Sequence, residues 1–179
     1  MSDEAVNIQV KRLDTGLPLP AKAYPGDAGF DLMSAIDCVL QPSGRALIPT
    51  GLAVAIPEGF AGFALPRSGL SLRVGLGQAN SPGLIDSRYR GELKIVAINL
   101  DPYAPIHIKR GDRIAQLVIL ALPQVGWQEV AELDETERGE QGFGSSGYGA
   151  ADAKVAEHGS TTATSSPGTD TENKQAGDD

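Results

Sequence analysis

One short stretch, residues 83–91 (GLIDSRYRG), combines residue types that could hold a small polar ligand and attack it. Asp86 supplies a carboxylate that can act as a general base toward a water within hydrogen-bonding reach. Tyr89 supplies a planar ring, and the glycine at each end leaves backbone groups open to a ligand. Residues 93–99 follow and are rich in β-branched side chains, so we predict a hairpin. The alternative is that Asp86 only shapes the turn, as short polar side chains often do.

A second stretch, residues 66–70 (PRSGL), has the composition of a phosphate-binding turn. Arg67 offers a fixed fork of donors that matches phosphate geometry. Ser68 adds a hydroxyl, and Gly69 allows backbone N–H groups to approach an anion closely. The alternative is an ordinary exit from a strand with a surface arginine.

Two further polar residues stand among apolar neighbours. Asp31 lies in residues 28–32 (AGFDL), where a partly buried acid needs a partner. It is either a structural turn acid or a group that holds water on a metal ion. Gln116 lies in residues 111–117 (GDRIAQL), and its amide must be hydrogen-bonded if it faces the core. If the strand alternates regularly, Gln116 faces water instead.

The stretch at residues 138–147 (RGEQGFGSSG) contains the letters of a dinucleotide-binding fingerprint, from Gly142 to Gly147. That interpretation fails because no strand-to-helix unit follows. What remains is an arm with Arg138, Phe143, two serines and many open N–H groups, which could close over a nucleotide. The alternative is that these residues begin a disordered segment.

Composition favours one domain followed by a tail. The chain has 179 residues, 41% of them hydrophobic, and its 22 glycines and 12 prolines favour short strands and turns over long helices. A formal net charge of −8 argues against general nucleic-acid binding. Residues 152–179 carry six acids and two lysines, which is half of that charge, and no Leu, Ile or aromatic residue follows Tyr148. We therefore predict a domain over residues 1–148 and an acidic disordered tail over residues 149–179.

Cysteine content and hydropathy give an expected compartment. Cys38 is the one cysteine, so no internal disulfide can form, and we read it as a small buried hydrophobic residue. The acidic start of the chain has no apolar signal region, and the longest apolar runs, such as residues 117–122, are too short to span a bilayer. We expect a soluble cytoplasmic protein with no membrane partner. With two histidines and one cysteine, no zinc site is expected.

The spacing of apolar runs and turn residues predicts an all-β barrel or sandwich. One helix of a turn or two is expected at residues 68–74. Residues 127–133 are a candidate final strand. The other predicted strands are residues 8–13, 30–35, 45–50, 52–56, 62–65, 93–99, 106–108 and 114–120.

Taken together and in this order, the stretches at residues 28–32, 66–70, 83–91, 111–116 and 138–147 resemble the signature motifs of the trimeric deoxyuridine triphosphatase (dUTP pyrophosphatase) family. The resemblance covers nearly the whole chain as far as Gly147. The fit to actinobacterial members is especially close, through residues 12–20 and 98–102. Each motif is weak alone, and the complete ordered set is specific.

The resemblance implies a jelly-roll-like β-barrel that forms a homotrimer with three active sites at subunit interfaces and a C-terminal arm. It implies Mg²⁺-assisted hydrolysis of dUTP to dUMP and pyrophosphate, which limits uracil in DNA and supplies dUMP for dTMP synthesis. Asp86 would hold and deprotonate the water that attacks the α-phosphate, with Gln116 and Ser68 completing the catalytic set. No protein group would ligate Mg²⁺ directly, and Asp31 would lie in its outer shell.

The implied substrate contacts fall into a base and sugar group, a phosphate group and the arm. Uracil would meet backbone groups of the hairpin, Tyr89 would lie under the deoxyribose and exclude a ribose 2′-OH, and Phe143 would stack on the base. The full set is Arg67, Ser68, Gly69, Asn80, Leu84, Ile85, Asp86, Tyr89, Lys94, Arg138, Phe143, Gly144 and Ser145.

Three other functions are compatible with parts of the pattern. A dCTP deaminase of the same fold group would need a glutamate placed at the pyrimidine ring, where this chain offers Asp86. A catalytically silent, nucleotide-binding regulatory trimer would not need all the motifs intact. A purely structural β-protein would bind no dUTP.

Overall fold

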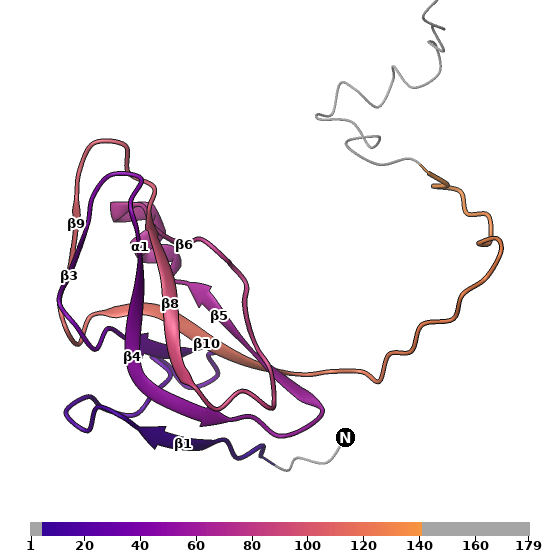
Figure 1. Cartoon of the computed structure of the whole chain (residues 1–179), viewed down its shortest axis with the longest axis horizontal. Helices are drawn as coiled ribbons and strands as arrows, with labels where there is room; N and C mark the ends of the chain where they lie inside the picture. Colours follow the sequence, from indigo (N-terminus) through magenta and orange to yellow (C-terminus); the bar gives the residue numbers. More distant parts are fainter. Residues whose placement is uncertain (1–4, 141–179) are drawn as a thin grey trace, which may run out of the picture. The chain divides into compact units, whose positions relative to one another are not determined.

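A computed structural model describes residues 5–140 of the chain (Figure 1). Nearly all of its regular structure is β-strand. The elements are β1 (Gln9–Arg12), β2 (Phe30–Met33), β3 (Cys38–Leu40), β4 (Arg45–Ala55), β5 (Phe60–Pro66), α1 (Ser68–Val74), β6 (Leu76–Gln78), β7 (Gly83–Ile85), β8 (Glu92–Asn99), β9 (Ile106–Ile108) and β10 (Arg113–Ala121).

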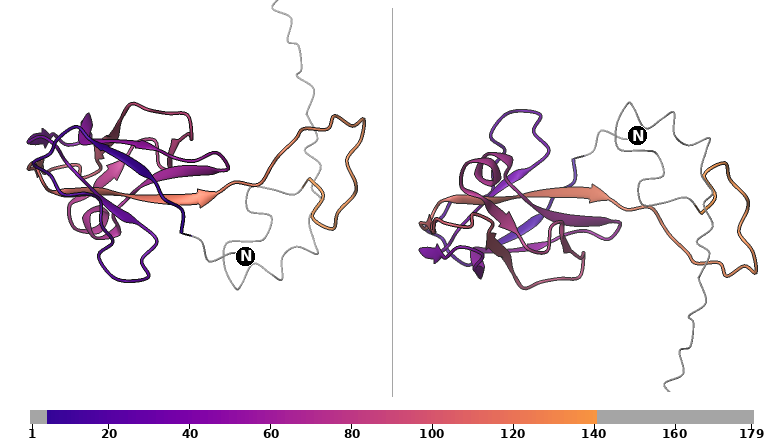
Figure 2. Two further views of the ribbon diagram at one scale, coloured as in Figure 1. Left: turned by 90° about the horizontal axis from the view of Figure 1, so that it is seen from below. Right: turned by 90° about the horizontal axis from the view of Figure 1, so that it is seen from above.

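The strands form two four-stranded sheets and one two-stranded ribbon. One sheet has the order β1-β4-β8-β6, the other has the order β2-β10-β5-β7, and β3 pairs with β9. Every pairing among these strands is antiparallel. Figure 2 shows β10 running along the length of the barrel, where it pairs with both β2 and β5. The predicted all-β, jelly-roll-like barrel is confirmed.

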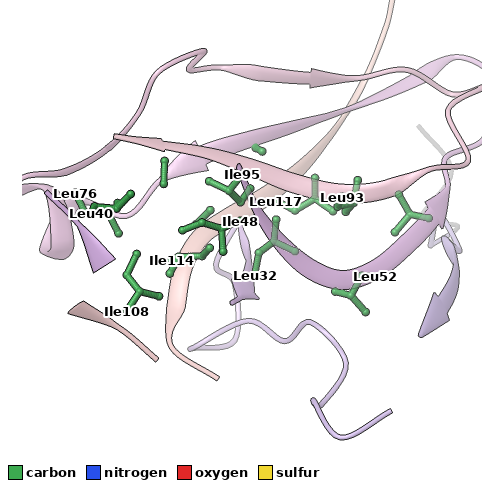
Figure 3. Close-up of a cluster of buried hydrophobic side chains, with 14 of the residues drawn as sticks. Leu32, Leu40, Ile48, Leu52, Leu76, Leu93, Ile95, Ile108, Ile114 and Leu117 are labelled. Atoms are coloured by element: carbon green, nitrogen blue, oxygen red, sulfur yellow. The ribbon is translucent and has the colours of Figure 1, made fainter. Parts of the chain in front are cut away.

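The core lies between the two large sheets, because each strand turns alternate side chains inward. Along β8, Leu93, Ile95, Ala97 and Asn99 are buried while Lys94 is exposed. Figure 3 shows the cluster extending from Leu40 and Leu76 at one end to Leu52 at the other. The buried apolar members are Leu32, Leu40, Ile48, Leu52, Val54, Ile56, Ala64, Leu76, Leu93, Ile95, Ala97, Ile106, Ile108, Ile114, Ala115 and Leu117.

One buried polar side chain holds a turn from inside the core. Asn99 is fully buried and donates from Nδ2 to the carbonyls of Leu40 and Ala104, at 3.0 and 2.8 Å. Its Oδ1 accepts from the N–H of Asp101. The amide is therefore satisfied on both sides, as burial of a polar group requires.

Several predicted elements are confirmed in position. The helix α1 spans the predicted residues 68–74 and ends at Gly75, whose φ of 69° suits the left-handed cap that glycine favours. With seven residues, α1 is the one helix in the described part of the chain, and it is far too short to cross a membrane. Cys38 is half-buried and packs against the core, as expected for a small hydrophobic residue.

Two strand predictions are wrong in detail. The runs at residues 45–50 and 52–56 are one strand, β4, which continues through Gly51 with a register shift against β8. Gly51 adopts a φ of 70°, so it forms a bulge in the strand and does not end it. The predicted strand at residues 8–13, whose alternating apolar and polar residues are typical of a half-buried strand, is present as β1, but all four residues of β1 are exposed because β1 is the edge strand of its sheet.

The predicted final strand at residues 127–133 is also wrong. These residues form no strand, since no described strand offers the partner backbone that a ladder needs. A second compact unit begins at Gln128, and its described part, residues 128–140, contains bends and turns only. The predicted tail at residues 149–179 lies outside the described residues.

Candidate active site

The predicted hairpin is wrong as a strand pair, because β7 pairs with β5 whereas β8 pairs with β4 and β6 in the other sheet. The segment at residues 83–91, for which we keep the name hairpin, connects the two sheets and forms one wall of a cavity. β7 ends at Ile85, and the turn that follows closes when the N–H of Tyr89 donates to the carbonyl of Asp86, at 3.1 Å. The Asp86 side chain is exposed at this turn. The cavity has a volume of about 290 Å³ and is lined by Leu32, Leu47, Ala64, Gln78, Asn80, Gly83, Leu84, Ile85, Asp86, Tyr89, Glu92, Leu93 and Lys94. It thus gathers every base-binding and sugar-binding residue that the sequence predicts for the hairpin.

Tyr89 is held at this cavity by its hydroxyl. The Tyr89 hydroxyl donates to the carbonyl of Glu92 at 2.9 Å, and 44% of the residue remains exposed. The ring passes so close to Gly91 that a Cβ at this position would lie 2.6 Å from Tyr89 Cζ. Gly91 is therefore required for the observed position of the ring.

Gln78 is a site residue that the sequence analysis missed. It belongs to β6, and its Nε2 donates to the Ala64 carbonyl at 3.1 Å and to Asn80 Oδ1 at 3.3 Å. A signal was available, because Leu76 and Gln78 share a strand face, and a core-facing Leu76 implies a buried glutamine amide in need of partners. Leu76 is indeed 3% exposed and Gln78 9%.

A second cavity, of about 200 Å³, gathers the residues predicted to bind phosphate. It is lined by Ala23, Asp27, Gly29, Asp31, Arg67, Ser68, Gly69, Leu70, Arg73 and Gln116. Arg67 precedes the first turn of α1, and its carbonyl accepts from the N–H groups of Leu70 and Ser71. The earlier N–H groups, of Ser68 and Gly69, have no acceptor within the helix because the first turn of any helix leaves such donors unpaired. These two donors and the two arginines give the cavity the means to bind an anion.

Asp31 fixes the orientation of Arg67 in this cavity. Its side chain is 13% exposed, and its carboxylate accepts from Arg67 Nε at 2.9 Å and from an Arg113 guanidinium nitrogen at 3.1 Å. The Arg67 Nη1 donates to the Arg113 carbonyl at 3.1 Å, so the guanidinium is held by two contacts. Of the alternatives for Asp31, the structure thus shows a half-buried acid paired with two arginines.

Gln116 is half-buried on β10 and satisfied by the neighbouring strand. Its Nε2 donates to the Pro66 carbonyl at 3.0 Å, one residue before Arg67. A Cβ on Gly29 would lie 2.6 Å from Gln116 Oε1, so the small residue at position 29 leaves room for the amide. Of the two predicted orientations, the hydrogen-bonded one is observed.

Asp86 and Arg67 lie toward opposite ends of β5 on one chain. β5 and β7 are antiparallel, with Gly83 opposite Ala64 and Ile85 opposite Gly62, so Asp86 lies near the start of β5. Arg67 follows the other end of the strand. Strand rise then separates the Asp86 and Arg67 backbones by about 20 Å. The residues that line one cavity do not line the other.

The other charged residues of the hairpin serve the turn itself. Arg88 pairs with Glu58 at 3.3 Å, with both side chains at least 80% exposed, and such a pair contributes little to stability. Arg90 donates to the carbonyls of Ser87 and Tyr89. Neither arginine lines the cavity that contains Asp86.

The described residues contain no group of three or more His, Cys, Asp or Glu side chains placed to hold a metal ion. His107, on β9, is exposed. Arg138 lies in the described part of the second unit, at residues 128–140, and makes an interaction there. Phe143, Gly144 and Ser145, which the sequence places in the closing arm, lie outside the described residues.

Comparison with known proteins agrees with this arrangement. The family model described as dUTPase matches residues 15–147. The chain is 56% identical over 146 residues to a deoxyuridine 5'-triphosphate nucleotidohydrolase of Mycobacterium marinum, covering 79% of this chain and 95% of the relative. It is 54% identical over 147 residues to the enzyme of the same name from Corynebacterium glutamicum, covering 82% and 98%.

Solved structures resemble the chain in the same way. A dUTPase variant of Staphylococcus bacteriophage 80alpha with dUpNHpp superposes with a TM-score of 0.74 at 34% identity, covering 79% of this chain and 99% of the other. A dUTPase of S. aureus phage phi11, described as revealing the coordination of a structural Mg(II) ion, has a TM-score of 0.66 at 30% identity and covers 72% and 99%. By family model, by sequence and by fold, this chain belongs to the dUTPase family.

Proposed function

We propose that this protein hydrolyses dUTP to dUMP and pyrophosphate by attack of water on the α-phosphate. The observation that carries the proposal is the exposed carboxylate of Asp86 at the edge of a cavity that also holds Asn80 and Tyr89. A carboxylate at this place can hold a water and accept its proton, provided that the α-phosphate lies beside it. The product dUMP is a precursor for dTMP, and removal of dUTP keeps uracil out of DNA.

The hairpin cavity binds the deoxynucleoside in this proposal. Uracil lies against the backbone near Asn80, Leu84, Ile85 and Lys94, which line the cavity around Asp86. The Tyr89 ring lies under the deoxyribose, where a ribose 2′-OH would meet a ring that the Glu92 carbonyl and Gly91 hold in place. A rigid aromatic surface of this kind selects by shape.

The second cavity binds the phosphates. Arg67 and the N–H groups of Ser68 and Gly69 neutralise charge on the triphosphate, and Asp31 keeps the guanidinium in place. Ser68 also offers its hydroxyl, and Gln116 its amide, to the attacking water or to a phosphate oxygen. Phosphoryl transfer depends on positioning and on charge neutralisation, and these residues supply both.

These residues are compatible with Mg²⁺ that is bound by the triphosphate of the substrate. Mg²⁺ keeps several waters and commonly binds through substrate phosphates with few protein carboxylates. Asp31 is the carboxylate nearest the phosphate-binding residues and would act in the outer shell, since its oxygens already accept from Arg67 and Arg113. Bound Mg²⁺ would lower the negative charge of the phosphates.

The separation of the two cavities supports a homotrimer whose sites lie between chains. Asp86 must reach the α-phosphate of the same triphosphate that Arg67 grips, yet these residues lie at opposite ends of β5. A second copy of the chain can bring its own cavity to the first. The segment after β10 also exposes apolar side chains that a neighbouring copy could cover, with Val125 73% and Trp127 99% exposed.

The arm at residues 138–147 completes the proposal. It would close over bound dUTP, with Arg138 and Ser145 donating to phosphate, Gly144 allowing close approach and Phe143 stacking on uracil. Closure of such a segment excludes water from the reacting groups. The acidic tail at residues 149–179 and a cytoplasmic location stay predictions from composition.

The test is release of pyrophosphate from dUTP, dTTP, dCTP and UTP with Mg²⁺, by wild type and by Asp86→Asn. We expect release from dUTP alone and a loss of about 100-fold or more in kcat for the variant, because removal of a general base costs 10²–10⁴-fold. Ser87→Ala, next in the same turn, is the matched control and should stay active. If wild type binds dUTP without hydrolysing it, the protein is a catalytically silent nucleotide-binding protein. Ammonia release from dCTP would indicate a deaminase.

A further inference from the structure

Gln78 has an unusual position between the two sheets. It is the last residue of β6, in the sheet β1-β4-β8-β6, and its Nε2 donates to the carbonyl of Ala64 on β5 in the other sheet. Because a carbonyl oxygen can only accept a hydrogen bond, the NH₂ end of the Gln78 amide must point to β5. Gly83 leaves room for it, since a Cβ there would lie 2.5 Å from Gln78 Nε2. The Gln78 amide is therefore fixed from two sides.

The same Nε2 group determines how Asn80 is turned. Nε2 lies 3.3 Å from Asn80 Oδ1, so the acceptor end of the Asn80 amide faces Gln78. The donor end, Nδ2, is then directed away from Nε2. Asn80 is exposed and borders the cavity with Asp86 and Tyr89, where a ligand can reach its free end. Without Gln78, the Asn80 amide could turn over and present either end.

Uracil and cytosine differ at C4, in the group that could hydrogen-bond to such an amide. Uracil has a carbonyl oxygen at C4, which accepts a hydrogen bond, whereas cytosine has an amino group there, which donates one. An amide held with its NH₂ toward the ligand favours the carbonyl and leaves an amino group facing another donor. A site that leaves buried polar groups unpaired with the wrong ligand discriminates strongly against it.

We infer that Gln78 is a positioning residue for base selection, which holds Asn80 with its NH₂ toward the ligand so that the site accepts a 4-oxo pyrimidine and rejects a 4-amino pyrimidine. The inference rests on the proposed function and adds to it the side chain that sets discrimination between uracil and cytosine. It concerns the Gln78 side chain, whereas the hairpin backbone binds the rest of the base.

The second Gln78 polar atom argues against a role in packing alone. Gln78 Oε1 is buried and is the buried side-chain atom without a hydrogen-bond partner among the described residues. A leucine or methionine of similar size would fill the same space between Leu76 and Ala64 and would bury no unpaired acceptor. An unsatisfied buried group calls for an explanation, and orientation of Asn80 supplies one.

The experiment compares wild type with Gln78→Leu and Gln78→Met for the ratio of kcat/KM between dUTP and dCTP. The ratio between dUTP and UTP is measured in parallel, because sugar selection by Tyr89 should not depend on Gln78. We expect both variants to lower the dUTP to dCTP ratio by about tenfold or more while the dUTP to UTP ratio stays within about twofold. Thermal unfolding should show at most a small loss of stability, since the apolar replacement removes the donor to the Ala64 carbonyl but also removes the unpaired Oε1.

A double-variant cycle tests whether Gln78 acts through Asn80. Asn80→Ala should lower the base ratio by itself, and Gln78→Leu should lower it no further in that background, because residues that act as one unit are not additive. An unchanged base ratio in a folded Gln78 variant, or equal losses for all four nucleotides, would overturn the inference. Binding of dUMP and dCMP gives the same ratio without turnover. A wild type that binds dUMP but hydrolyses nothing would therefore reject the proposed function and leave the inference testable.

Discussion

At the scale of single residues, the site depends on side chains that neighbouring groups hold in place. Asp31 holds Arg67, the Pro66 carbonyl holds Gln116, and the Glu92 carbonyl holds Tyr89. Such fixed side chains lose little freedom when a ligand binds. Substitutions beside these groups should therefore change selectivity as well as rate.

Gly91→Ala should impair sugar selection. The added methyl group would overlap the Tyr89 ring, with 2.6 Å to Cζ and 3.0 Å to Cε2, so the ring must move. We expect the ratio of kcat/KM between dUTP and UTP to fall by about tenfold, as one lost packing contact in a binding pocket is worth 10–200-fold. Gly126→Ala is the matched control, because a Cβ there meets nothing within 4 Å. Equal loss toward both nucleotides would show that Tyr89 does not select the sugar.

A site residue can be predicted from the sequence when its role is visible in the residues beside it along the chain. Asp86, Arg67 and Ser68 stand in short stretches of unusual composition, and the structure gathers them in two cavities. Gln78 stands in a plain strand, and its role depends on Ala64, a neighbour that is close only after two sheets pack together. The strand face shared with Leu76 indicates that Gln78 is buried, but the sequence does not show which group it contacts.

At the scale of elements, local patterns predicted which segments form strands better than they predicted where each strand begins and ends. Gly51 breaks the apolar pattern of β4, yet the strand continues because β8 pairs on both sides of the bulge. The positive φ of Gly51 also brings its carbonyl to the N–H groups of Leu13 and Asp14. A bulge of this kind positions the loop beside it, and it can be recognised only when the partner strand is known.

The loop that Gly51 positions is also tied by an ion pair with a defined pH dependence. The Arg110 guanidinium donates three hydrogen bonds from Nε and Nη2 to the two oxygens of the Asp14 carboxylate, and the Gly16 N–H donates another. These bonds hold the pKa of Asp14 below its ordinary value. A carboxyl with a lowered pKa in the folded state stabilises the fold above its unfolded pKa. That contribution is lost as the pH falls through the folded pKa.

Arg110→Met should raise the Asp14 pKa toward the ordinary range, which an NMR titration of the carboxyl carbon measures directly. The difference in the free energy of unfolding between variant and wild type should become smaller as the pH drops below that range, because Asp14 becomes protonated in both proteins. Arg45→Met replaces another exposed arginine and should leave the Asp14 titration as it is. An unchanged Asp14 pKa in Arg110→Met would mean that the Gly16 hydrogen bond and the nearby charge of Arg12 lower it without Arg110.

At the scale of the whole molecule, the barrel separates the two halves of the proposed site along β5 of one chain. β5 connects them, with Asp86 beside its start and Arg67 after its end. A closed symmetric assembly solves this, because every copy offers both cavities and each cavity can meet the complementary one of a neighbour.

Mixing two inactive variants tests this arrangement. Asp86→Asn lacks the base in the hairpin cavity, and Arg67→Ala lacks the guanidinium in the phosphate cavity, so each alone should be nearly inactive toward dUTP. If a site combines cavities from two chains, random assembly of equal amounts should complete about a quarter of the sites, because each position then has an independent chance of holding the intact half. Unfolding and refolding the two variants together should restore activity to that level.

The control is a mixture of Asp86→Asn with Asp86→Ala, which can complete no site in any arrangement and should stay inactive. Native mass spectrometry of the mixtures, with one variant tagged, establishes that mixed assemblies have formed. If mixed trimers form and no activity returns, each chain builds its own site, and β5 must then bring Asp86 and Arg67 together through a rearrangement of the barrel. If activity returns, Asp86 and Arg67 of one site come from different chains, and their separation along β5 explains why hydrolysis requires the assembly.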